Sequence, residues 1–311
     1  MHEKLTEEYF AQLPTGPGIY RFYNAYQQLL YVGKSMHLRQ RIRSYFHPSQ
    51  TWSKADEMLR ILDRIEIEET DTHLDARLLE CQWIQTYHPP FNAAMRNSRN
   101  YVFLTLSLVH GIGISRTRKR NSIGPFRSQH RLQDFKLRMM RLLIENNGLF
   151  HHIINNEQAA NAFLYEVLQS SPKIQTLQTQ LTQARDHALA EENYERAEQL
   201  GNPLPILEEI QAKLENFENF FAKAFYFSLE IPNGVKHYYV PQGLVQHTEI
   251  QKTQNAWQKE PLFSLPYFLF YGGAQVQKLH PSLAYDRQEI LLSAHRSGEI
   301  NLIPVEEILC R

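Results

Sequence analysis

Cysteine is scarce in this sequence of 311 residues, which contains only Cys81 and Cys310. Two thiols are too few for a disulfide framework or for a four-thiolate metal site. A long apolar run is also missing, because the longest one, near 263–271, is short and is broken by Pro266. The first eight residues are polar and acidic rather than apolar, unlike a signal peptide. We therefore expect a reduced, cytoplasmic protein with no membrane partner.

A net charge is lacking as well, since 33 basic side chains balance 33 acidic ones. This balance excludes a general attraction of the whole chain to polyanions. The charged residues are nevertheless segregated by sign along the chain. Those in 9–55 are all basic, those in 56–80 are mostly acidic, those in 96–141 are mostly basic, and the stretch that follows is acidic. Such a chain could hold a phosphate backbone on one face and a protein partner on another, although each run could equally be a solvated face.

Hydrophobic periodicity and turn residues predict a compact α/β domain over about residues 10–108. Ser35 is a plausible N-cap for a helix, and Thr72 with Asp75 indicates the start of a second helix, which the sequence His88-Pro89-Pro90 ends. The expected elements are strands at 19–23, 29–33, 65–68 and 101–108 and helices at 35–46 and 72–87.

The rest of the chain is expected to contain a helical region and a smaller α/β region. Helix formers at 174–192 and 194–200 are separated at Asn193, which indicates a helical hairpin, and the helix resumes after 201–205 to about Phe221. Strand-like runs at 224–231 and 237–240 precede a helix near 285–295. We therefore expect domains at 1–108, 109–225 (basic, then acidic and helical) and 226–311.

Cations, phenols and a single carboxylate recur along the first domain in a pattern that suits phosphodiester hydrolysis. The hairpin places Tyr20 and Tyr31 on adjacent strands, and Arg41 and Tyr45 share one helix face because they are four residues apart. No Ser-His or Cys-His pair stands out as a nucleophilic site. The full set is Tyr20, Tyr31, Lys34, Arg41, Tyr45, Glu80 and Asn92.

These residues lie in motifs that closely resemble the GIY-YIG nuclease domain of the bacterial excinuclease UvrC family. The motifs are Gly18-Ile19-Tyr20, Tyr31-Val32-Gly33-Lys34, Leu38-Arg39-Gln40-Arg41-Ile42-Arg43-Ser44-Tyr45-Phe46, Asp75-Ala76-Arg77-Leu78-Leu79-Glu80 and Pro89-Pro90-Phe91-Asn92. The resemblance covers about the first 130 residues well and the rest loosely. It implies a small nuclease domain with a central antiparallel sheet flanked by helices.

The resemblance also implies a role for each residue of the set. Glu80 would be the only protein ligand of a single Mg²⁺ or Mn²⁺, and Tyr31 would be the general base, helped by the positive charge of Lys34. Arg41, Tyr20 and Tyr45 would stabilise the charge on the phosphorus, and Asn92 would hold the hydrogen-bond network of the site. We expect DNA contacts from Arg39, Arg43, Arg118, Lys119 and Arg120.

The chain ends at Arg311 and shows neither a second nuclease nor helix-hairpin-helix motifs, so it is similar to short homologues of UvrC built around the GIY-YIG half. This likeness implies incision of damaged double-stranded DNA on the 3′ side of a lesion during nucleotide excision repair. Relatives carry a cysteine-rich stretch that 148–172 lacks, so we expect no iron–sulfur cluster. The stretch 189–200 resembles the hairpin through which UvrC binds UvrB, although it could be an ordinary helical hairpin. We expect a monomer with UvrB as partner.

Two other functions stay open. The chain could be a GIY-YIG scaffold that binds DNA or UvrB without cutting, which the intact Tyr31, Arg41 and Glu80 disfavour. It could also be a structure- or sequence-specific nuclease outside excision repair. Such nucleases usually carry a zinc finger or a helix-turn-helix, and the sequence shows no ligand spacing for the zinc finger.

Overall fold

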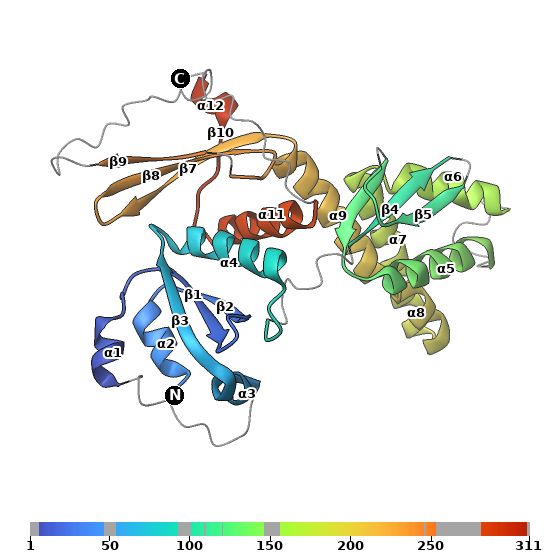
Figure 1. Ribbon diagram of the computed structural model, residues 1–311. Helices are drawn as coiled ribbons and strands as arrows, with labels where there is room; N and C mark the ends of the chain where they lie inside the picture. The colour runs from blue at the N-terminus through green and yellow to red at the C-terminus, as the bar shows by residue number, and fades with distance from the viewer. Residues whose placement is uncertain are drawn as a thin grey trace. The chain divides into compact units, whose positions relative to one another are not determined.

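The computed structural model describes residues 6–46, 54–92, 101–108, 110–119, 121–145, 156–245, 247–252 and 281–309. The chain forms two compact units (Figure 1). Unit 1 combines residues 1–98 with residues 223–311, so both ends of the chain contribute to it. Unit 2 consists of residues 99–222.

The first part of unit 1 is a three-stranded antiparallel sheet with helices against it. Its elements are α1 (Glu7–Gln12), β1 (Gly18–Asn24), β2 (Leu29–Ser35), α2 (Leu38–Ser44), α3 (Lys54–Ile61), β3 (Leu62–Glu69) and α4 (His73–Tyr87). The strand order is β2-β1-β3, and Tyr20 pairs with Gly33 while Phe22 pairs with Tyr31. The predicted hairpin and the predicted strand at 65–68 are therefore confirmed.

The two faces of this sheet bury different side chains, as the period of two along each strand requires. Tyr20 and Phe22 of β1 pack with Leu38 and Ile42 of α2. On the opposite face, Ile19 of β1 and Val32 of β2 pack with Ala76 and Ile84 of α4. The sheet is thus held between α2 and α4.

One of the two expected helix starts is confirmed and the other is wrong. The Thr72 hydroxyl accepts a hydrogen bond from the Asp75 N–H at 3.1 Å, and α4 runs to Tyr87 as expected. Ser35 instead ends β2, where it pairs with Gly18, and its hydroxyl accepts a hydrogen bond from the His37 N–H at 2.9 Å. Because the strand ladder extends through Ser35, α2 begins only at Leu38.

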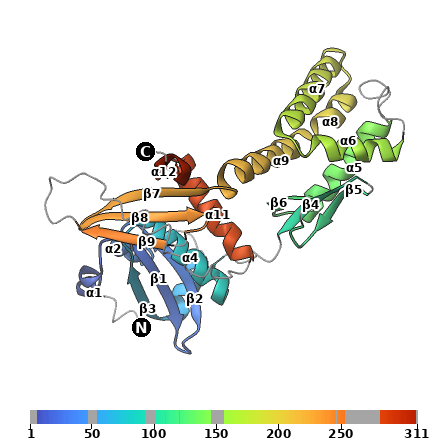
Figure 2. The same ribbon diagram turned by 90° about the horizontal axis from the view of Figure 1, so that it is seen from above.

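The last part of unit 1 is a second antiparallel sheet with its own helices. It comprises β7 (Ala224–Ile231), β8 (Gly234–Pro241), β9 (His247–Lys252), α11 (Pro281–Arg296), β10 (Ile303–Pro304) and α12 (Val305–Leu309), with strand order β10-β7-β8-β9. The predicted strands and the predicted helix near 285–295 are confirmed. Figures 1 and 2 show α11 lying alongside α4, so α4 is covered both by the first sheet and by the C-terminal segment.

Unit 2 contains a three-stranded antiparallel sheet followed by helices. The strands are β4 (Val102–Ser107), β5 (Gly111–Ser115) and β6 (Ser122–Phe126), in the order β5-β4-β6. The helices are α5 (Gln129–Glu145), α6 (Glu157–Val167), α7 (Ser171–Ala190), α8 (Tyr194–Gly201) and α9 (Leu204–Asn216), and Phe217–Phe221 form a π-helix. The expected helical hairpin is confirmed as α7 and α8, whereas β5 and β6 lie in a stretch for which we predicted no strand. Across the described parts of the chain, no helix combines the length and the apolar character needed to cross a membrane.

Candidate active site

Two glycines allow the β1–β2 hairpin to bring its tyrosines together. The Tyr20 ring lies directly across Gly33, where an added Cβ would be 2.3 Å from the Tyr20 hydroxyl oxygen. A Cβ at Gly18 would be 2.3 Å from the Glu68 carbonyl oxygen of β3. Distances this short are not tolerated in proteins, so both positions require glycine. The same register puts Tyr31 beside Tyr20, with ring centres 6.1 Å apart.

Three phenols and one guanidinium form a hydrogen-bonded cluster at this face of the sheet. The hydroxyl groups of Tyr20 and Tyr45 lie 2.9 Å apart. Arg41 donates from Nε to the Tyr20 hydroxyl at 3.3 Å and from Nη2 to the Tyr45 hydroxyl at 3.4 Å. The Tyr31 ring centre is 6.2 Å from that of Tyr45. The predicted positions on α2 and on the hairpin therefore lie together.

Glu80 of α4 is bound by both the backbone and the side chain of Lys34. The Lys34 N–H donates to Oε1 at 3.2 Å, and the Lys34 ammonium lies 2.8 Å from Oε2. Glu80 is only 7% exposed, which makes an unpaired charge there costly. Lys34 therefore balances the charge of the one carboxylate that the sequence analysis assigned to this site.

Asn92 fastens the segment after the double proline to strand β2. Its Oδ1 accepts a hydrogen bond from the Val32 N–H at 2.9 Å, and its Nδ2 donates to the Val32 carbonyl at 2.8 Å. Both bonds are buried, and they join residues 60 positions apart. Asn92 thus fixes the strand from which Tyr31 and Lys34 project.

Burial raises the pKa of the Tyr31 phenol above its ordinary value, and hydrogen bonding to Tyr45 and the negative charge of Glu80 raise it further. The pKa of Tyr20 is also raised, mainly by burial and then by the neighbouring Tyr45. The sequence analysis expected Lys34 to help Tyr31 lose its proton. In the structure the Lys34 ammonium is paired with Glu80 instead.

The donor set around Glu80 fits a hard divalent cation. In the described segments no group of three or more His, Cys, Asp or Glu side chains gathers at one place, so Glu80 is considered as a ligand by itself. A single carboxylate suits Mg²⁺, which keeps several waters and is often bound through one or two carboxylates together with phosphate oxygens. Glu80 is the side chain that would hold such an ion.

The expected DNA-contacting residues lie in two different units. In unit 1, Arg39 donates from Nε to the Leu13 carbonyl at 2.8 Å, and Arg43 pairs with Glu7 at 2.7 Å. In unit 2, Arg118 and Lys119 are exposed between β5 and β6, and the Arg118 guanidinium lies 4.7 Å from the Phe217 ring centre. Arg120 lies outside the described residues. Arg39 and Arg43 thus also have local structural partners.

Two residues of the C-terminal segment contact α4 or its cap and were not predicted as part of the site. Lys236 pairs with Asp71 and Asp75, and the Tyr238 hydroxyl lies 2.9 Å from the Thr72 hydroxyl. Residues 237–240 were predicted only as a strand. The available signal in the sequence was a lysine directly before an aromatic strand. Nothing in the sequence indicates its partners, which are 161 and 165 positions away.

Comparison with known families defines the class of this site. Residues 16–93 match the sequence model of the UvrC-like GIY-YIG domain, a range that contains the seven predicted active-site residues. This segment of unit 1 is therefore a GIY-YIG domain of the UvrC type, and its mixed α/β fold is as expected.

Similar proteins include the UvrABC system protein C of several organisms. The chain is 36% identical over 101 residues to the UvrABC system protein C of Caldicellulosiruptor saccharolyticus, covering 32% of this chain and 17% of that one. It is 29% identical over 157 residues to the protein of the same name from Methanococcus maripaludis, covering 47% and 30%. The chain thus aligns with less than a third of the length of either relative.

Crystal structures of the N-terminal GIY-YIG endonuclease domain of Thermotoga maritima UvrC are also similar in sequence. The form bound to magnesium, described as its catalytic divalent cation, is 32% identical and matches 30% of this chain and 100% of that domain, with a TM-score of 0.27.

Proposed function

We propose that this protein is a metal-dependent DNA endonuclease that incises damaged DNA during nucleotide excision repair. The observation that carries the proposal is the geometry of the site: Arg41 is bound to two phenols, and Tyr31 lies beside them. Glu80 presents a nearly buried carboxylate on the adjoining helix. These groups lie in the segment that matches the UvrC-like GIY-YIG domain.

Each residue has a distinct part in the proposed hydrolysis. Glu80 would hold one Mg²⁺ or Mn²⁺, and the ion would supply positive charge to the scissile phosphate and to the leaving oxygen. Arg41 neutralises charge that develops on the non-bridging oxygens, and its bonds to Tyr20 and Tyr45 hold its guanidinium in place. Asn92 keeps β2, and with it Tyr31 and Lys34, in register.

Tyr31 would take the proton from the attacking water. Its phenol, like any ordinary phenol, is neutral at physiological pH, and burial and the charge of Glu80 raise its pKa further. A positive ion beside Glu80 would oppose the second of these effects, since a nearby cation favours the charged form of an acid. The base would therefore become active when substrate and ion are both in place.

The finer features of the function remain predictions. We propose that the cut falls on the 3′ side of the lesion, that UvrB delivers the damaged duplex, and that the protein acts as a monomer without an iron–sulfur cluster. The protein would be a functional counterpart of the short UvrC homologue Cho. Resemblance in sequence supports the incision side and the UvrB partner, together with the exposed end of the α7–α8 hairpin, and the lack of cysteine in 148–172 supports the absence of a cluster.

The test is incision of a 5′-labelled duplex that carries one bulky adduct, with Mg²⁺ and with or without UvrB on the DNA. We expect one cut on the 3′ side of the adduct, dependent on UvrB. DNA or UvrB binding without product would favour the non-cutting scaffold. Equal cutting of undamaged or branched DNA without UvrB would favour a nuclease outside excision repair.

A further inference from the structure

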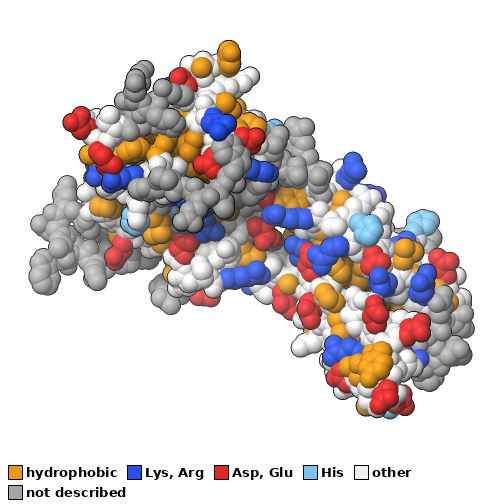
Figure 3. Space-filling view, turned by 90° about the horizontal axis from the view of Figure 1, so that it is seen from below, with side chains coloured by type: hydrophobic (Ala, Val, Ile, Leu, Met, Phe, Trp, Pro, Cys, Tyr) orange, Lys and Arg blue, Asp and Glu red, His pale blue; other side chains and the backbone are white. Residues whose placement is uncertain are grey.

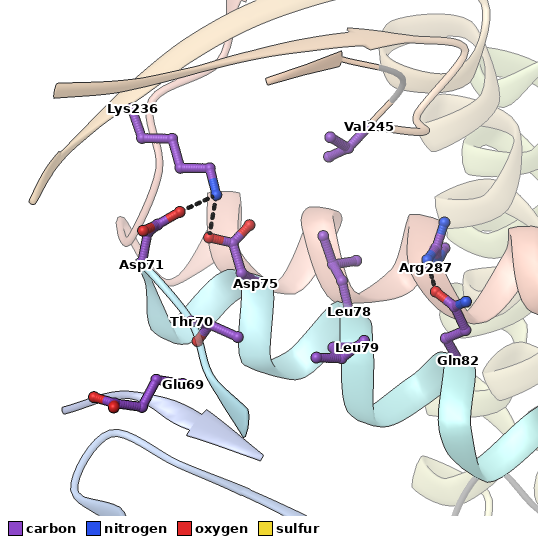
Figure 4. Close-up of a pocket in the computed structure, with 10 residues that line it drawn as sticks. All are labelled: Glu69, Thr70, Asp71, Asp75, Leu78, Leu79, Gln82, Lys236, Val245 and Arg287. Carbon is purple, nitrogen blue, oxygen red and sulfur yellow. Dashed lines mark hydrogen bonds and ion pairs between the residues drawn. The ribbon is translucent and has the colours of Figure 1, made fainter. Parts of the chain in front are cut away.

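Helix α4 carries Glu80 on one side and contacts the C-terminal segment on another. Glu80 faces Lys34 of β2, whereas Asp75, Leu78 and Gln82 line a pocket of about 360 Å³ beside β8 and α11. Figure 4 shows these side chains pointing from α4 toward Lys236 and Arg287 of the C-terminal segment. The position of the carboxylate therefore depends on what holds this helix.

The strongest of these contacts is a buried ion-pair network at the first turn of α4. The Lys236 ammonium lies 2.7 Å from Asp71 Oδ2 and 3.0 Å from Asp75 Oδ2. Lys236 is 9% exposed and the Asp75 side chain is largely covered, whereas the Asp71 side chain is 43% exposed. Removing Lys236 strands the largely covered charge of Asp75, which is far more destabilising than losing a surface pair.

A buried tyrosine reinforces the same turn. Tyr238 is fully buried, its hydroxyl donates to Asp75 Oδ2 at 3.0 Å, and it lies 2.9 Å from the Thr72 hydroxyl that caps α4. The N-cap of the helix is therefore bonded to strand β8. A change in β8 would reach α4 through the cap itself.

Contacts further along α4 show that the attachment extends over the whole helix. Arg77 donates to Glu299 at 2.8 Å and to the Ile290 carbonyl at 3.3 Å. Near the end of α4, Arg287 of α11 donates to Gln82 at 2.9 Å. Polar bonds thus join the C-terminal segment to the first, second and third turns of the helix that carries Glu80.

We infer that the described C-terminal elements (β7, β8, β9, α11, β10 and α12) hold the helix of the nuclease site and that Lys236 is a positioning residue for Glu80. This inference rests on the proposed function of Glu80 as the metal-holding carboxylate. The C-terminal segment fixes the N-terminal turn of α4, and the packing of α4 between the first sheet and α11 then sets where the carboxylate meets Lys34. The segment acts through the helix and does not touch the substrate.

The test compares Lys236→Met with the wild-type full-length chain by amide hydrogen exchange and by metal-dependent cleavage. We expect exchange in the first turns of α4 to rise about 10²-fold, since a broken buried pair permits local opening. The Mg²⁺ concentration for half-maximal cleavage should rise and the single-turnover rate should fall by about 10²-fold, because displacement of a catalytic group by about 1 Å has that effect. DNA affinity should not change.

Two further variants make the result decisive. Lys173→Met removes an exposed lysine that pairs with Glu166 in unit 2, and it should change neither α4 exchange nor the metal requirement. Asp71→Asn keeps the Lys236–Asp75 pair, so it should fold even if Lys236→Met does not, and it should shift both readouts in the same direction to a smaller extent.

Unchanged α4 exchange in Lys236→Met, or in Asp71→Asn if the first variant does not fold, would overturn the inference. Exchange that rises while the Mg²⁺ requirement stays at the wild-type value would also overturn it, because the role would then be structural only. A wild-type protein that does not cut DNA would contradict the proposed function, and the exchange measurement would still report whether the segment holds α4.

Discussion

Arg41 and Arg43 lie two positions apart on α2 but have different partners. Arg41 is bonded to two phenols of the cluster, whereas Arg43 is exposed and paired with Glu7 of α1. We predict that Arg41→Ala lowers the single-turnover cleavage rate by about 10²-fold, the usual loss for one preorganised charge stabiliser. Arg43→Ala should instead weaken DNA binding and reduce its salt slope by about one.

Gel-based cleavage assays and salt titrations of DNA binding in parallel separate the two roles. Arg39→Ala is less informative, because its bond to the Leu13 carbonyl gives it a structural role as well. A large rate loss in Arg43→Ala together with a small one in Arg41→Ala would contradict the assignment of these side chains.

The pKa of Tyr31 predicts the pH dependence of cleavage. The base must be deprotonated, and burial raises its pKa above the ordinary phenol value, so only a small fraction is active at neutral pH. The logarithm of the single-turnover rate should therefore rise with pH with a slope of about one across the neutral and mildly alkaline range. Stopped assays at constant Mg²⁺ measure this slope, and Tyr31→Phe should abolish the reaction. A flat profile would exclude Tyr31 as the base.

At the residue scale, the sequence motifs indicated which groups belong to the site but not how each is paired. Arg41 and Tyr45 meet as the helix spacing implied, because positions four apart share a face, and the hydrogen bonds of both to Tyr20 of β1 were not indicated by that spacing. The pairing of Lys34 with Glu80 was not predictable, since it joins a strand and a helix 46 positions apart. The raised pKa of Tyr31 comes mainly from burial, which the sequence did not indicate.

At the scale of elements, Cys81 reports on the contact between α4 and α11. It is fully buried, and burial raises the pKa of its thiol to about 12. Compared with an ordinary cysteine, this shift alone reduces the reactive thiolate by about 10³-fold near pH 8. In a Cys310→Ser background, we predict that Ellman's reagent modifies Cys81 at least that much more slowly than a model thiol.

Substitution at the α4–α11 contact should expose the same thiol. Arg77→Ala removes the bonds to Glu299 and Ile290 and is expected to accelerate labelling, whereas Lys173→Ala in unit 2 should not. Rapid labelling of the unsubstituted protein would mean that α11 does not cover α4 in solution.

Local signals predicted the elements well where turn and cap residues dominate. The Thr72–Asp75 capping box and the hairpin around residues 24–28 are examples, because their bonds are local. The prediction of Ser35 as a helix cap was wrong because Ser35 pairs with Gly18 in the β1–β2 ladder. Strands β5 and β6 were missed because they lie in a stretch interpreted by its charge rather than by alternation.

At the scale of the whole molecule, the sequence did not indicate that the two ends of the chain form one unit. The bonds responsible join Lys236 to Asp71 and Arg77 to Glu299, and no local pattern connects positions so far apart. The runs of like charge along the sequence also did not predict how charge is distributed on the surface. On the face of unit 2 seen in Figure 3, acidic and basic side chains are interspersed rather than gathered by sign.

The proposed UvrB contact lies at the turn of the α7–α8 hairpin. Tyr194 is 67% exposed there, and Leu189 is exposed beside it, so both are available to a partner. Leu200, at the end of the same stretch, is fully buried in the core of unit 2 and is therefore not available to a partner. We predict that Tyr194→Ala weakens UvrB pull-down by about tenfold or more, as loss of an aromatic hot spot does.

Incision of UvrB–DNA complexes by the same variant should fall in parallel, while binding of free DNA stays unchanged. Leu137→Ala, which removes another exposed apolar side chain of unit 2, is the matched control. If Tyr194→Ala binds UvrB as the wild type does, the contact lies elsewhere.

The central claim is that Glu80 makes this domain a metal-dependent nuclease, and a Mg²⁺ titration of the Glu80→Ala variant tests it most directly. Single-turnover incision of the adduct-bearing duplex is measured beside DNA affinity, with Glu57→Ala on α3 as an exposed acidic control. We predict no product from Glu80→Ala at any Mg²⁺ concentration, unchanged DNA affinity, and wild-type incision by Glu57→Ala. Incision by Glu80→Ala at the wild-type rate would contradict the account.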